Sequence, residues 1–271
     1  NALGANSTGA YNTAVGSAAL DANTTADNNT AVGYNTLGAN TTGAQNTAVG
    51  ASALAANTTN TANTAVGYYA LKVSTAGNNT AVGANAGLVT VAGNYNTFMG
   101  ADTAIANTSG YSNSAFGAGS LAANTDADNN TAVGYLALAA NTTANNNTAV
   151  GKSALAANTT GANAVAIGTG ALDANTTAHN NVAIGYDALG ANTTGTRNVG
   201  IGYAVLDAAT TADDNTAIGN HALGANTTGS DNVAVGSYAL DANTTADNNT
   251  AVGADALTAA NGSTGSTAVG A

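Results

Sequence analysis

The sequence predicts an all-β protein, a parallel β-solenoid or β-roll of about 16 coils with a 17-residue repeat. A phrase that typically reads Asn-Thr-Ala-Val-Gly ends at Gly16 and recurs every 17 residues up to Gly270, except for one 16-residue step from Gly67 to Gly83. Helical repeats need about 33 residues to form a helix pair, so the unit is too short for them. Its strictly phased apolar positions exclude low-complexity disorder. We therefore expect residues 1–271 to form a single uninterrupted solenoid.

The strand of each coil is expected within this phrase. The residue before the glycine is Val, Ile, Met or Phe, and the residue two positions earlier is Thr, Ser or Val. Positions two apart share one face of a strand, and we expect this face to point inward together with a rank of leucines on the next segment. The predicted core ladder includes Val15, Leu20, Val133, Leu138, Val150, Leu155, Ile184 and Leu189.

The alanines between these positions are then expected to point outward. Ala14, Ala19 and their equivalents would form flat, uncharged faces suited to side-by-side contacts between chains. Each coil would bury about three large side chains at roughly 1.5–3 kcal/mol each, which is too little for a coil to fold alone. Stacking of neighbouring coils is therefore expected to be obligatory.

The turns have two recurrent polar features. The glycine after Val permits a corner with positive φ. An Asn-Thr-Thr segment follows later in the coil, and its Asn either forms a hydrogen-bonded ladder at the corner or serves as a glycan attachment site. The asparagines concerned include Asn23, Asn40, Asn57, Asn141, Asn158 and Asn175.

Aspartates follow several of the leucines and never occur there in adjacent coils. Asp173, Asp207 and Asp241 alternate with Gly190 and Gly224. Carboxylates stacked about 4.8 Å apart would repel one another, and alternation doubles that spacing. Oxygen-rich turns at 21–27 and 241–247 could also hold calcium, although the glycine-rich calcium β-roll motif is absent. Apart from this weak calcium signal, no cofactor or metal is expected.

Residues 68–117 depart from the repeat. One unit is short, and the aromatic residues there include Phe98 at a position that is otherwise Ala. Two interpretations stay open, local repacking around the deletion or a lateral contact site. Tyrosines that directly follow a repeat glycine are further candidates. The candidate contact surface comprises Tyr34, Tyr68, Tyr135, Tyr186, Tyr203 and Phe98.

Charge and composition exclude several function classes. A net charge of −11 with three basic residues is unsuited to binding nucleic acid or anionic membranes. No stretch approaches the roughly 18 apolar residues of a membrane span, so no membrane insertion is expected. His179 and His221 lie in non-adjacent coils, and no acid–base pair is evident. We do not expect an enzyme.

The phrases Asn163-Ala-Val-Ala-Ile-Gly168 and Asn181-Val-Ala-Ile-Gly185 resemble repeats in the head domains of trimeric autotransporter adhesins, and similar repeats occur in phage tail fibres. The resemblance implies a left-handed β-roll, three chains side by side and a surface-displayed fibre that binds host or matrix surfaces. The expected location is therefore extracellular, at the cell surface or on a virion fibre.

The preferred function is that of a structural, filament-forming protein. The 271 residues equal a whole number of coils, and the two ends joined together restore the repeat, so we expect head-to-tail stacking between copies. The rival interpretation is that the chain is an excerpt of a longer covalent array, whose interior would join in the same register. One alternative is an adhesin or tail-fibre rod with a host or cell-surface receptor. A lesser alternative is an ice-binding solenoid using the Thr24/Thr25 ranks, although adjacent threonines point to opposite strand faces.

Overall fold

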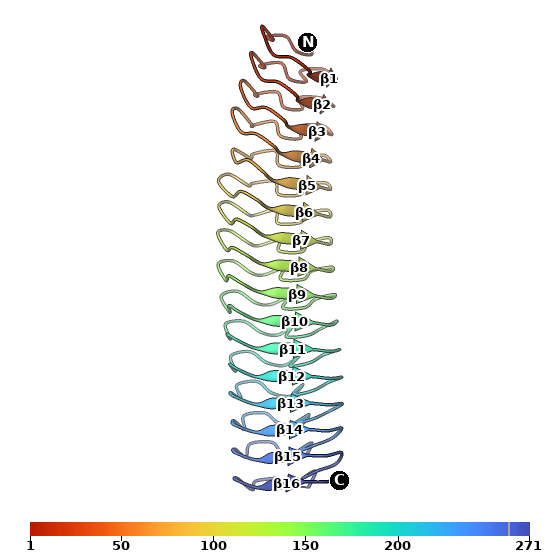
Figure 1. Cartoon of the computed structure of the whole chain (residues 1–271), viewed down its shortest axis with the longest axis vertical. Helices are drawn as coiled ribbons and strands as arrows, with labels where there is room; N and C mark the ends of the chain where they lie inside the picture. Colours follow the sequence, from red (N-terminus) through yellow and green to blue (C-terminus); the bar gives the residue numbers. More distant parts are fainter. Residues whose placement is uncertain (260) are drawn as a thin grey trace. The chain divides into compact units, whose positions relative to one another are not determined.

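The computed structural model describes residues 1–259 and 261–271, and every regular element in them is a three-residue parallel β-strand. The fold is an all-β solenoid, as the repeat predicts. The chain divides into two compact units, Asn1–Tyr135 and Leu136–Ala271. Within each unit the strands stack in chain order, one strand for each coil (Figure 1).

The first unit contains eight strands, β1 (Thr13–Val15), β2 (Thr30–Val32), β3 (Thr47–Val49), β4 (Thr64–Val66), β5 (Thr80–Val82), β6 (Thr97–Met99), β7 (Ser114–Phe116) and β8 (Thr131–Val133). The second unit contains β9 (Thr148–Val150), β10 (Val165–Ile167), β11 (Val182–Ile184), β12 (Val199–Ile201), β13 (Thr216–Ile218), β14 (Val233–Val235), β15 (Thr250–Val252) and β16 (Thr267–Val269).

Equivalent positions of the repeat lie directly above one another. Thr30 pairs with Thr47, and this in-register pairing recurs between the strands of each unit. Across the 16-residue step, Thr64 pairs with Thr80, so the register survives the deletion. The lost residue falls in the turn that follows Ser74, where a shorter loop does not disturb the ladder of strand hydrogen bonds.

The core differs from the prediction in one systematic way, because the strand faces are inverted. The central residue of each strand points inward, and from β2 to β15 the alanines at this position, such as Ala31 and Ala149, are fully buried, whereas Ala14 and Ala268 of the two end strands are half-buried. The first and third strand residues point outward. The predicted core positions Val15, Val133, Val150 and Ile184 are therefore wrong, since Val15 is 57% exposed and the other three are half-buried.

The leucine rank is inward as predicted. Leu20, Leu138, Leu155 and Leu189 have no exposed surface. The alanine rank of Ala19, which we expected to point outward, is also buried. The prediction of flat alanine faces for side-by-side contacts is thus wrong at both alanine ranks, because these alanines line the interior.

Small residues are required inside because the coil is narrow. At Gly200, which replaces a strand Ala, an added Cβ would lie 3.1 Å from Val205 Cγ1 and 3.3 Å from Leu189 Cδ1. The strand therefore packs directly against the leucine and alanine ranks of the opposite segment. A Val or Ile on the inner face of the strand would overlap with them, so these branched residues occupy the outer face.

Left-handed backbone conformations recur at fixed positions and close each coil. The glycine after the strand has φ between 126° and 147°, as predicted for a corner. The buried leucines also have positive φ, for example 49° at Leu20 and 52° at Leu155. Non-glycine residues seldom adopt this conformation. Here the leucine N–H groups pair with the next coil, as when Leu20 N donates to Thr36 O at 3.0 Å and Leu155 N donates to Ala171 O at 3.0 Å.

Two asparagine ladders connect the coils. In the Asn-Thr-Thr ladder, Asn40 Nδ2 donates to Asn23 Oδ1 of the preceding coil at 3.1 Å and to Gly43 O at 2.9 Å. All six asparagines named for this ladder are fully buried. The ladder interpretation is confirmed, and the glycan interpretation is wrong for these six, because the Nδ2 atom that would carry the sugar is enclosed in the protein.

The second ladder involves the Asn that precedes each strand, which the sequence argument did not single out. Asn46 N donates to Asn29 Oδ1 at 2.9 Å, and Asn46 Nδ2 donates to Asn60 O at 2.9 Å. The repeated Asn of the Asn-Thr-Ala-Val-Gly phrase was the available signal. In both ladders most of the buried amide atoms bond to groups that the repeat itself supplies, and Asn192 Oδ1 is among the exceptions.

Candidate functional site

The predicted contact tyrosines are exposed. Tyr34, Tyr68, Tyr135, Tyr186 and Tyr203 have between 50% and 65% of their surface exposed. Each follows a repeat glycine, so the ring leaves the coil at the corner beside the strand. Their exposure agrees with the predicted contact surface, whereas contact with a partner stays a prediction.

In the second unit these tyrosines belong to a larger group, here called the aromatic ladder, which comprises Tyr186, Tyr203, His221 and Tyr238. Tyr186 and Tyr203 stack with ring centroids 5.3 Å apart. His221 meets Tyr203 edge-on at 5.5 Å and stacks on Tyr238 at 5.4 Å. The four rings come from four consecutive coils. Sequence reasoning missed His221 and Tyr238 because they stand one position later after the repeat glycine.

Acidic groups lie next to this ladder and are electrostatically perturbed. The side chain of Asp187 raises the pKa of Tyr186. Burial raises the pKa of Asp173, and the carboxylate of Asp187 raises it further. Burial also raises the pKa of Asp207. Exposed aromatic rings beside carboxylates can offer stacking surfaces and hydrogen-bond acceptors to a polar ligand.

Phe98 is not part of any contact surface, and its assignment to the candidate site is wrong. Its side chain is fully buried in β6 at the inward Ala position. The space comes from Gly87, which replaces the inward Leu of the preceding coil. A Cβ added at Gly87 would lie 2.8 Å from Phe98 Cδ2 and 2.9 Å from Leu71 Cδ2. The local-repacking interpretation of residues 68–117 is therefore correct at Phe98.

The alternating aspartates and glycines form a packed rank. At Gly224, an added Cβ would lie 2.9 Å from Asp241 Oδ1, and at Gly190 it would lie 3.7 Å from Asp173 Oδ1. The carboxylate of one coil thus occupies the space over the glycine of the preceding or following coil. Alternation separates like charges, as predicted, and also provides room for each Asp side chain.

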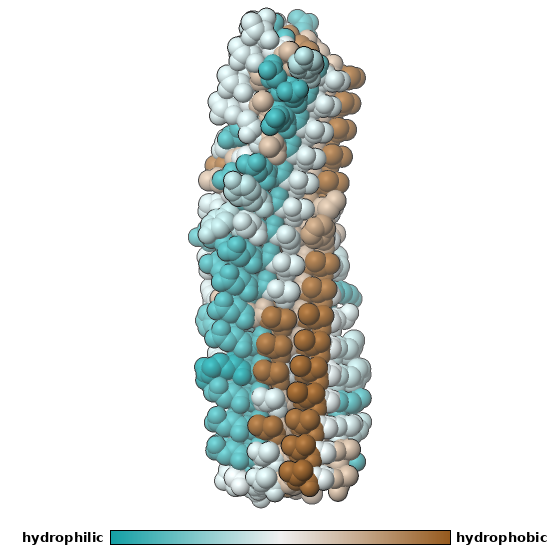
Figure 2. Space-filling model, viewed as in Figure 1, coloured by the Kyte–Doolittle hydropathy of each residue, from teal (hydrophilic) through white to brown (hydrophobic). Residues whose placement is uncertain are grey.

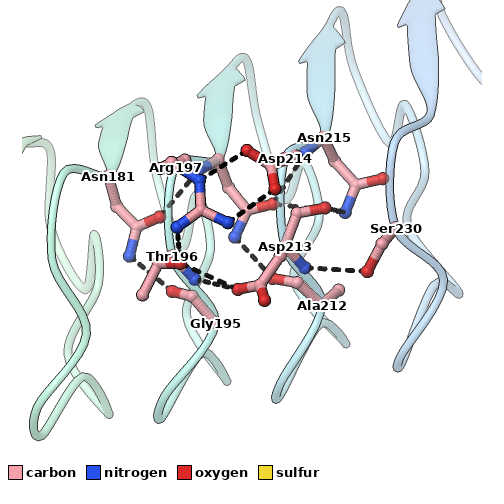
Figure 3. A network of polar contacts seen from close by, with 10 residues as sticks. Asn181, Gly195, Thr196, Arg197, Ala212, Asp213, Asp214, Asn215 and Ser230 are labelled. Atoms are coloured by element: carbon pink, nitrogen blue, oxygen red, sulfur yellow. Dashed lines mark hydrogen bonds and ion pairs between the residues drawn. The ribbon is translucent and has the colours of Figure 1, made fainter.

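A network of polar side chains in the second unit crosses neighbouring coils at the turn before the strand (Figure 3). Arg197 Nε and Nη2 donate to the two carboxylate oxygens of Asp214, both at 2.6 Å. Thr196 N donates to Asp213 Oδ1 at 2.6 Å, and Asp213 N donates to Ser230 Oγ at 3.1 Å.

Within this network Arg197 and Asp214 neutralise each other's charge. The hydrogen bonds from Arg197 lower the pKa of Asp214, and those to Asp214 raise the pKa of Arg197. A bidentate pair of this kind fixes the two turns in register. These polar side chains therefore have a structural role in joining neighbouring coils.

In each turn considered for calcium, one carboxylate is used within the protein. Asp27 Oδ1 accepts a hydrogen bond from Ala10 N at 2.6 Å, and Asp247 Oδ1 accepts one from Ser230 N at 2.7 Å. Among the described residues, no three or more His or Asp side chains group as metal ligands would. Calcium binding at 21–27 and 241–247 stays an untested prediction.

The two histidines do not form a shared site. His179 Nδ1 accepts a hydrogen bond from Ala162 N at 2.9 Å, and His221 belongs to the aromatic ladder. Over residues 1–259 and 261–271 the surface has no pocket. The same residues include no helix able to cross a membrane.

Comparison with known proteins finds no family model that matches the chain and no curated protein with significant similarity to it.

Proposed function

We propose that the chain is a structural protein that assembles into filaments by stacking β-coils, head to tail between copies. The observation that carries the proposal is that successive coils present the same hydrogen-bonding and apolar groups to one another. Thr30 N donates to Asn46 O and Thr47 N donates to Asn63 O, at 2.9 and 2.8 Å. A coil supplied by another copy would find the same donors, acceptors and apolar ranks.

The side-chain ladders favour the same form of assembly. Thr24 Oγ1 donates to Thr41 O at 3.2 Å, and Thr41 Oγ1 donates to Thr58 O at 3.1 Å. With the asparagine ladders, they give every coil several bonds along the stacking direction. Such a fibre fits the extracellular space, a cell surface or a virion, and detection of the native protein outside the cell tests that setting.

The experiment compares two variants of the last described strand. In β15, Thr250 N donates to Ser266 O of the next coil at 2.8 Å. Thr267→Pro removes the equivalent donor of β16, whereas Thr267→Val keeps it and places there a residue that the repeat already uses, as at Val233.

We expect filaments from the wild type and from Thr267→Val in negative-stain microscopy, and short particles from Thr267→Pro with unchanged circular dichroism. Wild-type particles that stay short and monodisperse at every concentration would refute the proposal. Sedimentation of the same samples also reports whether chains associate side by side into the trimer that the resemblance implies.

A second candidate function is that of an adhesin or tail-fibre rod that binds a receptor. The aromatic ladder favours it, because four exposed or half-exposed rings lie together on one unit. Tyr203→Ala with Tyr238→Ala should then abolish binding to glycan arrays or host cells and leave filament formation intact. Binding that survives this double change would exclude the ladder as the receptor site.

A further inference from the structure

The outward face of the strands in the second unit is regular and uncharged. We define the outer strand face as the first and third residues of each strand from β9 to β16. Every one of them is Thr, Val or Ile. In Figure 2, which has the orientation of Figure 1, the apolar side chains over these strands form one continuous column and, beside it, a shorter and interrupted column.

The face repeats in two directions. Neighbouring strands lie about 4.8 Å apart, and residues two apart on one strand are separated by about 6.7 Å. The side chains therefore form a two-dimensional array of methyl and hydroxyl groups. These distances are of the same order as those between water molecules on a prism face of ice. In the first unit the array is interrupted by the larger exposed side chains of Met99 and Phe116.

The threonine hydroxyls of this face are available to water. Within the part of the chain that the structure describes, no hydrogen bond joins the hydroxyl of a strand Thr, such as Thr148 or Thr216, to another protein group. The Thr24/Thr25 ranks differ, since Thr24 Oγ1 is already bonded to Thr41 O. Because the first and third strand residues point outward, the candidate ice-binding surface lies on the strands and not at the Asn-Thr-Thr corner.

A second copy of the chain fits this face poorly. Eight strands at about 4.8 Å, each about 10 Å wide, give roughly 350–400 Å² for each partner. A stable protein interface needs about 800 Å² on each side. Each copy also carries a net charge of −11, all of it outside the face, so two copies repel and gain no ion pair there.

We propose that the outer strand face binds crystalline water, that is, the surface of ice. Water next to methyl groups has restricted orientations, and here the methyl groups recur at regular distances. Hydroxyls in the same array can hydrogen bond to that ordered layer and fix its position on the protein. The hydration layer of the face then matches the growing crystal, and the absence of charge avoids disrupting it.

The test uses the full chain and measures retention in slowly growing ice together with thermal hysteresis. Ile201→Lys places a charge in the middle of the face. Thr194→Lys makes the same change in charge at an exposed corner position and is the matched control. We expect the wild type and Thr194→Lys to be retained in ice. The thermal hysteresis of Ile201→Lys should be at least tenfold smaller than that of the wild type.

A second variant guards against a folding defect in Ile201→Lys. Thr216→Tyr adds bulk at a half-exposed position of the face, and Thr216→Val keeps the shape that Val199 and Val233 already have there. Exclusion of the wild-type protein from ice would overturn the proposal. So would full activity in both face variants, or a wild type that avoids ice and dimerises through this face.

Discussion

Replacing Phe98 by Ala tests whether Phe98 and Gly87 are a compensating pair in the core. Phe98 is fully buried, and its ring occupies the space that an inward Leu fills in other coils. Truncation of a buried Phe to Ala costs about 3–5 kcal/mol of unfolding free energy, because a cavity remains. Phe116→Ala is the matched control, since Phe116 lies on the outer face and is 37% exposed. Its cost should be much smaller.

The second half of the test restores the regular coil. Gly87 has a φ of 59°, close to the 53° of the buried Leu121, so its backbone accepts Leu. Gly87→Leu alone should cost about 1–3 kcal/mol because the added side chain collides with the Phe98 ring. The double variant Gly87→Leu with Phe98→Ala recreates the usual Leu and Ala positions. We expect it to be more stable than either single variant.

Urea unfolding followed by circular dichroism gives the three free energies. Hydrogen exchange then locates the effect, because destabilisation of one coil acts first on its neighbours, here β5 to β7. A double variant as unstable as the sum of the two single variants would refute the compensation argument. A control variant as unstable as Phe98→Ala would show that the cost does not come from burial.

Three further predictions concern the ladders and the packed Asp rank. Asn192 Oδ1 is buried without a hydrogen-bond partner, because the next coil has Ala209 in place of Asn. Ala209→Asn should therefore raise the free energy of unfolding, measured in urea, by about 1 kcal/mol. A variant with no gain in stability would contradict the ladder interpretation. Gly224→Ala places a methyl group 2.9 Å from Asp241 Oδ1, so it should lower the melting temperature, and Asp241→Gly in the same chain should reverse the loss. The folded-state pKa of Asp173 is raised, so its contribution to stability is present at low pH and is lost as pH rises through that pKa. Asp173→Asn should therefore stabilise the protein at neutral pH, and should not stabilise it at a pH below the ordinary pKa of Asp. An effect on the melting temperature that does not depend on pH would argue against burial as the cause.

The period of the repeat predicts the solenoid, the strand positions, the glycine corners and the leucine rank, because each follows from spacing alone. The direction of the strand faces does not follow from spacing. Hydrophobicity and β-propensity favoured Val and Ile as the inward residues, yet opposite a Leu the interior of this coil admits only small side chains on the strand, and Phe98 fits because Gly87 replaces that Leu. The sequence signal that could have shown the direction was how much the residue type varies at each position of the repeat. Thr and Val exchange freely at the outer positions, whereas the inner Ala changes only at Phe98 and Gly200.

Those two exceptions show why an inner position could have been recognised. Phe98 is matched by Gly87, and Gly200 lies against Val205, which is larger than the usual Ala. A gain of volume at one site accompanies a loss at another, as close packing requires. The exposure of the contact tyrosines was predictable from their place after the corner. The complete aromatic ladder was not predictable in the same way, because its members occupy two different positions after the repeat glycine.

The hydrogen bonds between coils also determine how this chain would respond to force. Backbone bonds such as Gly33 N to Val15 O, at 2.8 Å, run along the stacking direction. Tension applied along that direction acts on the hydrogen bonds between neighbouring coils. We therefore expect the coils to separate one at a time, in steps. Each released coil frees 17 residues, or 16 at the short unit, which is roughly 55–60 Å of extended chain for a 17-residue coil in exchange for about 4.8 Å of stacked height. Each unit therefore holds a length of extended chain many times its own stacked height and would release it in nearly equal steps, as in an extensible tether.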